Sequence, residues 1–216
     1  RQKMQKKLLQ NEKGSAIVIA LLTLVALTLI GIIASTTSRI ETRITTNDVL
    51  YKQAFYSADG GTEIAREFIE QNLACPEGFS SLDTVNENLG EATDKNVAKI
   101  RVTDEKFAYK ESSPSGIYPS DSERDIWFVG PDYTLDDSDS TPHTNVVAFG
   151  VTEFSTGSAI QMAAGYEGKG KGAGAGGGRI VYEVHSRHEY RARNTDSHIM
   201  TEYQHLIGQE GDCPYN

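Results

Sequence analysis

An uninterrupted apolar run near the start of the chain is its clearest pattern. Residues 15–38 read SAIVIALLTLVALTLIGIIASTTS, and these 24 residues include no charged side chain. As an α-helix they would extend about 36 Å at about 1.5 Å per residue, against a bilayer core of about 30 Å. Core helices of soluble domains are rarely apolar on every side over this length. The pattern therefore predicts a transmembrane helix over residues 15–38.

The charges on either side of this run predict its orientation. Residues 1–14 carry five basic side chains and one acid, whereas the charges just after residue 38 have mixed sign. The positive-inside rule keeps residues 1–14 in the cytoplasm and sends the rest of the chain outward. The alternative is a secretory signal peptide, which has a shorter apolar region and a small-residue cleavage site that Ala34 and Ser35 partly imitate.

A helical pattern continues beyond the apolar run. Apolar residues recur at spacings near three, four and seven, namely Ile40, Ile44, Tyr51, Phe55, Ala58, Ala65, Ile69 and Leu73. Cys75 and Pro76 then end the helix. We therefore expect one helix over residues 15–73, with an amphipathic half within residues 39–75. Glycines weaken it, so Gly31 and the pair at 60–61 are candidate bends or close-packing points.

Beyond Pro76 the apolar pattern changes to the alternation of β-strands. Strands are predicted over residues 96–103, 126–129, 146–154, 179–187 and 198–207, with Asp, Ser, Gly and Pro clusters between them. An antiparallel sheet packed on the outer half of the long helix would bury its apolar stripe. The prediction is an α+β fold with a β-rich head over residues 76–216.

Charge and cysteine content narrow the possible partners. The formal net charge is −9 and the pI about 5.1, which argues against nucleic-acid binding because phosphate contacts need clustered Lys and Arg. The two cysteines, Cys75 and Cys213, both follow the predicted membrane span. Export would place them in an oxidising compartment, where they would form a single disulfide.

Three groups of residues could suggest ligand chemistry, and each has a simpler interpretation. Residues 165–178 hold eight glycines, and Gly165, Gly170 and Lys171 fit the start of a phosphate-binding loop. Gly172 stands where that loop needs Ser or Thr, and no helix follows, so a flexible loop between strands is favoured.

An acidic loop is a weak candidate for calcium. Asp132, Asp136, Asp137 and Asp139 lie close together, but without the spacing and central glycine of an EF-hand. A solvated acidic loop is the favoured interpretation.

The histidines do not form a clear zinc pattern. His185 and His188 are three apart in a predicted strand and so point to opposite faces. His185, His198 and His205 lie in strands predicted to be adjacent, where cross-strand pairing is the commoner arrangement. Motifs for nucleophilic or metal-dependent hydrolysis do not occur, and the sequence predicts neither a cofactor nor an enzyme.

The N-terminal residues resemble a known family. Lys13-Gly14-Ser15 before an apolar helix resembles a class III signal, in which prepilin peptidase cuts on the cytoplasmic side. The stretch YKQAFYSADGGTEIAR, residues 51–66, is similar to the A-x-x-x-A-[ED]-x-G signature of PilX-type minor pilins, and its matching residues are Ala54, Ala58, Asp59 and Gly61. The resemblance covers roughly residues 13–75.

This resemblance implies a processed, membrane-anchored pilus subunit. Cleavage between Gly14 and Ser15 would remove the leader, residues 1–14, and N-methylation would follow at Ser15. The subunit would have one span in the bacterial inner membrane, its head outside the cytoplasm, and would then enter a type IV pilus or the cell surface. Its N-terminal helix would contact the major pilin and other minor pilins. Family members prime assembly, occupy the filament sparsely or at its tip, and can contribute to adhesion or motility.

One position departs from the pattern of major pilins. Counted from Ser15, the fifth mature residue is Ile19, where major pilins usually carry Glu. That carboxylate is thought to pair with the N-terminal amine of a neighbour inside the apolar filament core, where an unpaired charge is costly. Its absence suits a tip subunit. The alternatives are a minor pseudopilin of type II secretion, a plain signal-anchored surface protein, and an exported module that binds calcium or another ligand.

Overall fold

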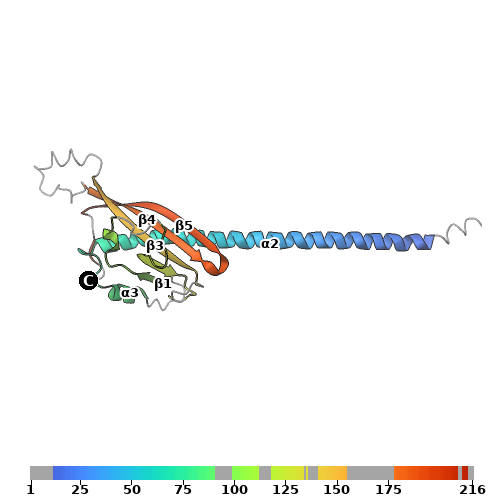
Figure 1. Cartoon of the computed structure of the whole chain (residues 1–216), viewed down its shortest axis with the longest axis horizontal. Coiled ribbons are helices and arrows are strands. Elements are labelled where there is room, and N and C mark those ends of the chain that lie inside the picture. Colours follow the sequence, from blue (N-terminus) through green and yellow to red (C-terminus); the bar gives the residue numbers. More distant parts are fainter. Residues whose placement is uncertain are drawn as a thin grey trace, which may run out of the picture. The chain divides into compact units, whose positions relative to one another are not determined.

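One long helix and one antiparallel sheet make up most of the chain. The computed structural model describes residues 12–90, 99–111, 118–133, 135, 141–154, 178–208 and 211–213. It divides into two compact units, Arg1–Val49 and Leu50–Asn216. Helix α2 is continuous from Glu12 to Leu73 and belongs to both units (Figure 1). The predicted single helix is confirmed, with the predicted C-terminal end.

The second unit is built on a five-stranded sheet. The strands are β1, Lys99–Val102; β2, Ile126–Val129; β3, His143–Phe154; β4, Gly178–Tyr190; and β5, Thr195–Leu206. Their spatial order is the same as their order in the chain, and all neighbours are antiparallel. The α+β prediction is confirmed. β3 begins three residues before the predicted start, and residues 96–98 of the first predicted strand lie outside the described residues.

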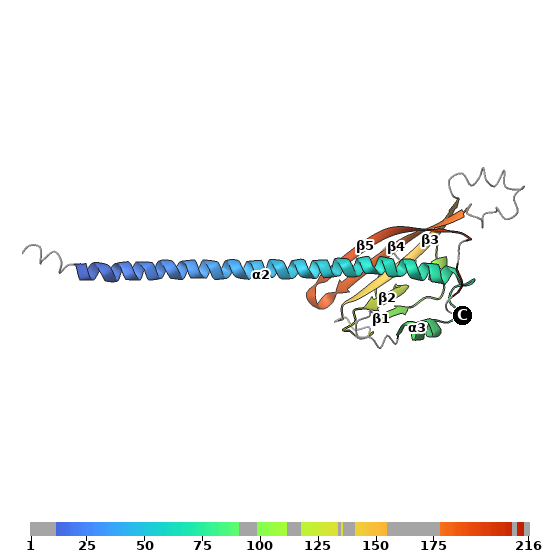
Figure 2. The ribbon, with the colours of Figure 1, turned by 180° about the vertical axis from the view of Figure 1, so that it is seen from behind.

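Helix α2 covers one face of this sheet, as the two opposite views in Figures 1 and 2 show. The buried core combines Ala65 and Ile69 of α2 with strand residues such as Ile126 and Tyr182. The Tyr182 hydroxyl donates a 2.7 Å hydrogen bond to the carbonyl of Ala108. The core therefore satisfies its largest polar side chain internally, as a buried hydroxyl requires.

The apolar stripe of the helix is only partly buried, which corrects the sequence expectation. Ala58, Ala65, Ile69 and Leu73 are buried, but Tyr51 and Phe55 are exposed by 63% and 41%. Ile40 and Ile44 are exposed as well. Within the second unit, the buried positions of α2 begin at Ala54. Periodicity gave the correct face of the helix, but it does not tell how far along that face the sheet extends.

Within the described residues, three short helical elements occur that were not predicted. They are α3, Leu82–Gly90, and the 3-10 helices η1, Phe107–Tyr109, and η4, Arg191–Arg193. Helix α3 packs beside β1, and the Asn86 amide both donates to the Val102 carbonyl and accepts from the Val102 N–H. These two bonds occupy backbone groups at an edge strand, which would otherwise be open to pairing with another chain.

A disulfide closes the second unit. It joins Cys75, just after the end of α2, to Cys213, which follows β5, with a Cα–Cα distance of 4.6 Å. Cys75 lies in the core, and Cys213 packs against it. The C-terminal segment is therefore tied covalently to the end of the long helix.

Candidate functional site

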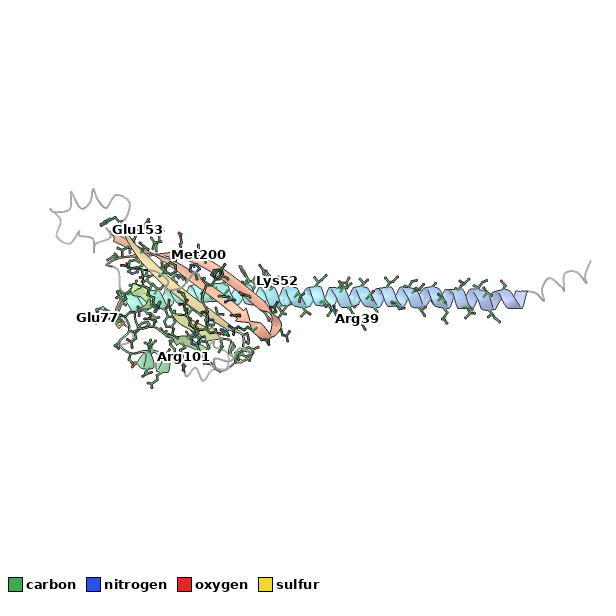
Figure 3. The ribbon with its side chains drawn as sticks, viewed as in Figure 1. Arg39, Lys52, Glu77, Arg101, Glu153 and Met200 are labelled. Atoms are coloured by element: carbon green, nitrogen blue, oxygen red, sulfur yellow. A yellow bond between two sulfur atoms is a disulfide. The ribbon has the colours of Figure 1, made fainter. Side chains whose placement is uncertain are left out.

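The apolar part of α2 presents a surface without cover from its own unit. The large apolar side chains from Ile17 to Ile33 are between 52% and 68% exposed. Among the described residues, α2 is the helix long and apolar enough to cross a membrane. Side chains project from all around it, on both sides of the labelled Arg39 in Figure 3. Exposing such a surface to water is unfavourable, and contact with lipid or with other apolar helices would stabilise it.

Threonine hydroxyls do not interrupt this apolar surface. Thr23, Thr28 and Thr36 each donate to a backbone carbonyl three residues earlier, at 2.8 to 2.9 Å. A hydroxyl bonded to its own helix satisfies its hydrogen-bonding need without an outside partner. The three polar residues are thereby compatible with apolar surroundings on every side of the helix.

The position of the missing carboxylate lies inside this surface. Ile19 is 58% exposed on α2, and residues 15–38 contain no acid that could replace it. The proposed cleavage site, Gly14 and Ser15, also falls within α2, and Ser15 is exposed.

The signature residues form the close contact between α2 and the sheet. Ala54 and Ala58 are buried, and so is Gly61. A Cβ atom added to Gly61 would lie 2.1 Å from the Ser186 Oγ and 3.1 Å from the Thr144 Cγ2. Only a residue without a side chain lets the helix approach β3 and β4 this closely. Asp59, the acidic residue of the signature, is exposed, so the structure gives it no packing role.

A carboxylate of α2 fixes the helix to β5. The Glu70 carboxylate accepts hydrogen bonds from the Tyr203 hydroxyl and from Nδ1 of His205, the latter at 2.8 Å. Burial, together with this bond to Glu70, raises the pKa of Tyr203 to about 12. Tyr203 and His205 share one face of β5. Their shared acceptor orients the helix on the sheet.

Three aromatic side chains of α2 remain on the surface of the second unit. Tyr51, Phe55 and Tyr56 are exposed by 63%, 41% and 69%, and the rings of Phe55 and Tyr56 meet edge to face with centroids 5.7 Å apart. Exposed aromatic residues are enriched where proteins bind one another. This patch, which the sequence pattern placed partly in the core, is a candidate contact surface.

A buried ion-pair network holds the segment between β1 and β2. Lys110 pairs with the buried Asp125 and, at 2.7 Å, with Asp104. Asp125 also accepts the Ala148 N–H at 2.9 Å. Burial raises the pKa of Asp125 despite these partners. Burial also acts to raise the pKa of Asp104, but the hydrogen bonds from Lys110 and from the Lys106 N–H outweigh it, so this pKa is lowered. No sequence pattern could identify this network, because its members are dispersed in loops.

The histidines lie on both faces of the sheet. His185 and His198 form a cross-strand pair, as expected for adjacent strands, while His188 contacts Thr144 and His205 contacts Glu70. Across the described residues, no three His, Cys, Asp or Glu side chains are grouped so as to hold a metal ion. Of the acidic-loop candidates, Asp132 is exposed, whereas Asp136, Asp137 and Asp139 lie outside the described residues, as does the glycine-rich stretch 165–177.

Comparison with known proteins identifies the N-terminal region. Residues 13–63 match the family model described as PilX N-terminal. The match spans the apolar helix and the signature residues, and it confirms the resemblance to PilX-type minor pilins. No curated protein and no solved structure is significantly similar to the chain. The family is a structural component of type IV pili, so the match suggests a type IV pilus minor pilin.

Proposed function

We propose that this chain is a minor pilin that takes part in priming and assembling a type IV pilus. The observation that carries the proposal is the PilX N-terminal match over residues 13–63, which coincides with the uncovered apolar surface of α2. The apolar helix is held by lipid in the bacterial inner membrane before assembly and by neighbouring pilin helices afterwards. The head, residues 76–216, faces away from the cytoplasm, and any contribution to adhesion or motility falls to it.

Processing precedes assembly in this proposal. Prepilin peptidase cuts between Gly14 and Ser15, where the basic leader ends and the apolar run begins. The new amine belongs to Ser15 and is N-methylated. The exposed part of α2, from residue 15 onward, then packs against the major pilin and other minor pilins.

Ile19 supports a tip position. Each mature subunit brings one positive N-terminal amine into an apolar filament core, where an unpaired charge is costly. A subunit with Ile19 offers no acid to the amine of a neighbour, and the hydroxyls of Thr23 and Thr28 are bonded to their own helix. At the tip, its own amine can be paired by an acid on the subunit below, and no further subunit needs an acid from it.

Expression of the protein with the assembly machinery but without the major pilin tests this function. We expect no long filament from this chain alone, because each added subunit would bury one uncompensated amine. Restoring the major pilin should restore filaments that contain the chain at low copy number. The variant Ile19→Glu should enter the shaft more often if the missing charge is the barrier, with Ile17→Glu as the matched control. Micrometre-long filaments of the unmodified chain alone would contradict the charge argument.

A further inference from the structure

A carboxylate and two imidazoles form a continuous hydrogen-bonded chain on the face of the sheet turned away from α2. In β4, Nε2 of His185 lies 2.7 Å from the Glu183 Oε1, and its Nδ1 lies 3.1 Å from Nε2 of His198 in β5. The two imidazole planes are within 9° of each other. The Tyr118 ring packs on His198 with centroids 4.7 Å apart. Met200, labelled in Figure 3, is the register partner of His185 on this face.

The chemistry of the three groups determines where the protons lie at neutral pH. A carboxylate only accepts hydrogen bonds, so Nε2 of His185 carries a hydrogen. The Nδ1 of a neutral His185 is then an acceptor, and the bond to His198 requires that His198 donate from its Nε2. Each ring therefore has one defined tautomer, set by Glu183 at one end of the chain.

A first and a second added proton have different effects on the hydrogen bond between the two rings. A proton added at Nδ1 of His198 leaves the bond to His185 in place, since Nε2 of His198 still donates. A second proton must go to Nδ1 of His185, and it would set one N–H against another. The bond between the rings is then lost, and two like charges face each other.

The surroundings make the second proton costly. His185 is fully buried, so water cannot solvate its charge. The pKa of His198 is lowered mainly by burial and, to a smaller extent, by the neighbouring His185. Among the described residues, the ionisable groups that face the pair come from two strands and one loop: Glu183 and Arg187 of β4, Asp196 and Glu202 of β5, and the Tyr118 phenol. Strand β3 contributes only uncharged side chains there, Val147 and Phe149. Arg187 is paired with Asp196, which leaves Glu183 as the acid in direct contact with the pair.

We propose that Glu183, His185 and His198 form a two-stage proton latch on the outer face of the head. With no added proton or with one, the latch holds the His198 ring beside His185, and Tyr118 packs on that ring. The second proton separates His198 from His185, and Tyr118 loses its packing partner. The outer face of the head thereby becomes sensitive to acid independently of the filament contacts made by α2.

The test uses the full chain in detergent micelles with ¹⁵N-labelled histidine. A scalar coupling between Nδ1 of His185 and Nε2 of His198 should be seen at pH 7.5, because it reports the hydrogen bond directly. It should persist through the first titration step and disappear in the second. The ring resonances of Tyr118 should move with the second step.

Two variants and one control decide the outcome. His198→Asn should abolish the acid response of Tyr118, whereas the control His188→Asn, on the other face of β4, should keep it. Glu183→Gln keeps an acceptor for His185 but removes the charge, so the second step should shift about one pH unit lower. A Tyr118 response that survives in His198→Asn, a coupling absent at pH 7.5, or a coupling that persists at pH 4 would overturn the latch. If His198→Asn fails to fold, an unshifted second step in Glu183→Gln overturns it as well.

Discussion

Gly60 and Gly61 are neighbours in α2, yet their surroundings differ. A Cβ atom at Gly60 would have no heavy atom within 4 Å, while one at Gly61 would collide with Ser186 in β4. The sequence marks both positions as bends or close-packing points. It cannot distinguish them, because the direction in which each faces depends on where the sheet lies. The helix is continuous through both.

The two alanine substitutions should therefore act in opposite directions. Gly61→Ala should destabilise the head by about 1–3 kcal/mol through overpacking against Ser186 and Thr144. Gly60→Ala should stabilise it by up to about 1 kcal/mol, because alanine favours the helix over glycine. Denaturant unfolding of the full chain in micelles, followed by the emission of the single tryptophan, the buried Trp127, measures both.

A double variant isolates the contact. Ser186→Ala removes the nearest atom to the added Cβ, so the pair Gly61→Ala/Ser186→Ala should recover part of the lost stability. Equal stability of Gly60→Ala and Gly61→Ala would show that the close approach of α2 to β4 is wrong.

His188 gives a prediction about pH. Burial first, and the nearby His143 second, lower the pKa of His188 to about 4. The unfolded chain takes up this proton near pH 6.5. The contribution of His188 to stability is therefore complete above pH 6.5 and is lost as the pH falls toward 4. The upper limit of this loss is about 3 to 4 kcal/mol, at about 1.4 kcal/mol per pKa unit, and the actual loss is smaller because the side chain is partly exposed.

His188→Gln keeps a polar side chain beside Thr144 but does not titrate. The wild type should lose stability relative to this variant between pH 7.5 and pH 4.5, measured with Trp127 emission. A difference that is constant over this range would mean that His188 is not held neutral in the fold.

At the scale of elements, the sequence predicted the kind and order of structure better than its extent. All five predicted strands occur, because alternating Val, Ile, Phe and Tyr residues between turn clusters are a strong local signal. The coverage of α2 was overestimated, since Tyr51 lies before the first buried helix residue of the head. Helix α3 was not predicted, although Leu82, Val85 and Leu89 follow a helical spacing and pack on the core. Nine residues are too few for this spacing to distinguish a helix from a loop, and the Asn86 contact with Val102 also holds the segment.

The disulfide links elements that are distant in the chain. Cys75 and Cys213 are 138 residues apart, and closing a loop of this size is worth about 4–5 kcal/mol in the chain-entropy model. Replacing both by alanine should lower the unfolding free energy by up to this amount. A reducing agent should destabilise the wild type to a similar degree and leave the double variant unaffected.

Mass spectrometry checks the pairing itself. Protein from the cell envelope, alkylated without reduction, should yield a peptide that links Cys75 to Cys213. Free thiols on both residues would contradict the exported location of the head as well as the bond.

For the whole molecule, the sequence indicates what the N-terminal region resembles, whereas the structure shows which distant segments contact one another. The apolar run and the signature predicted the similarity to the PilX N-terminal family, which the match over residues 13–63 confirms, without any tertiary information, because each is a local pattern. The contacts that hold α2 on the sheet join residues more than a hundred positions apart. They link Gly61 to Ser186, and Glu70 to β5. Such pairings follow from the fold and cannot be deduced from one sequence.

The most direct test is the composition of purified filaments. Pili should be sheared from cells that carry the complete assembly system and analysed by N-terminal sequencing and quantitative mass spectrometry. We predict peptides of the head in the filament fraction, at far lower copy number than the major pilin, and a mature N-terminus at Ser15. A chain that stays in the inner membrane with residues 1–14 attached, and that never appears in filaments, would contradict its identification as a minor pilin.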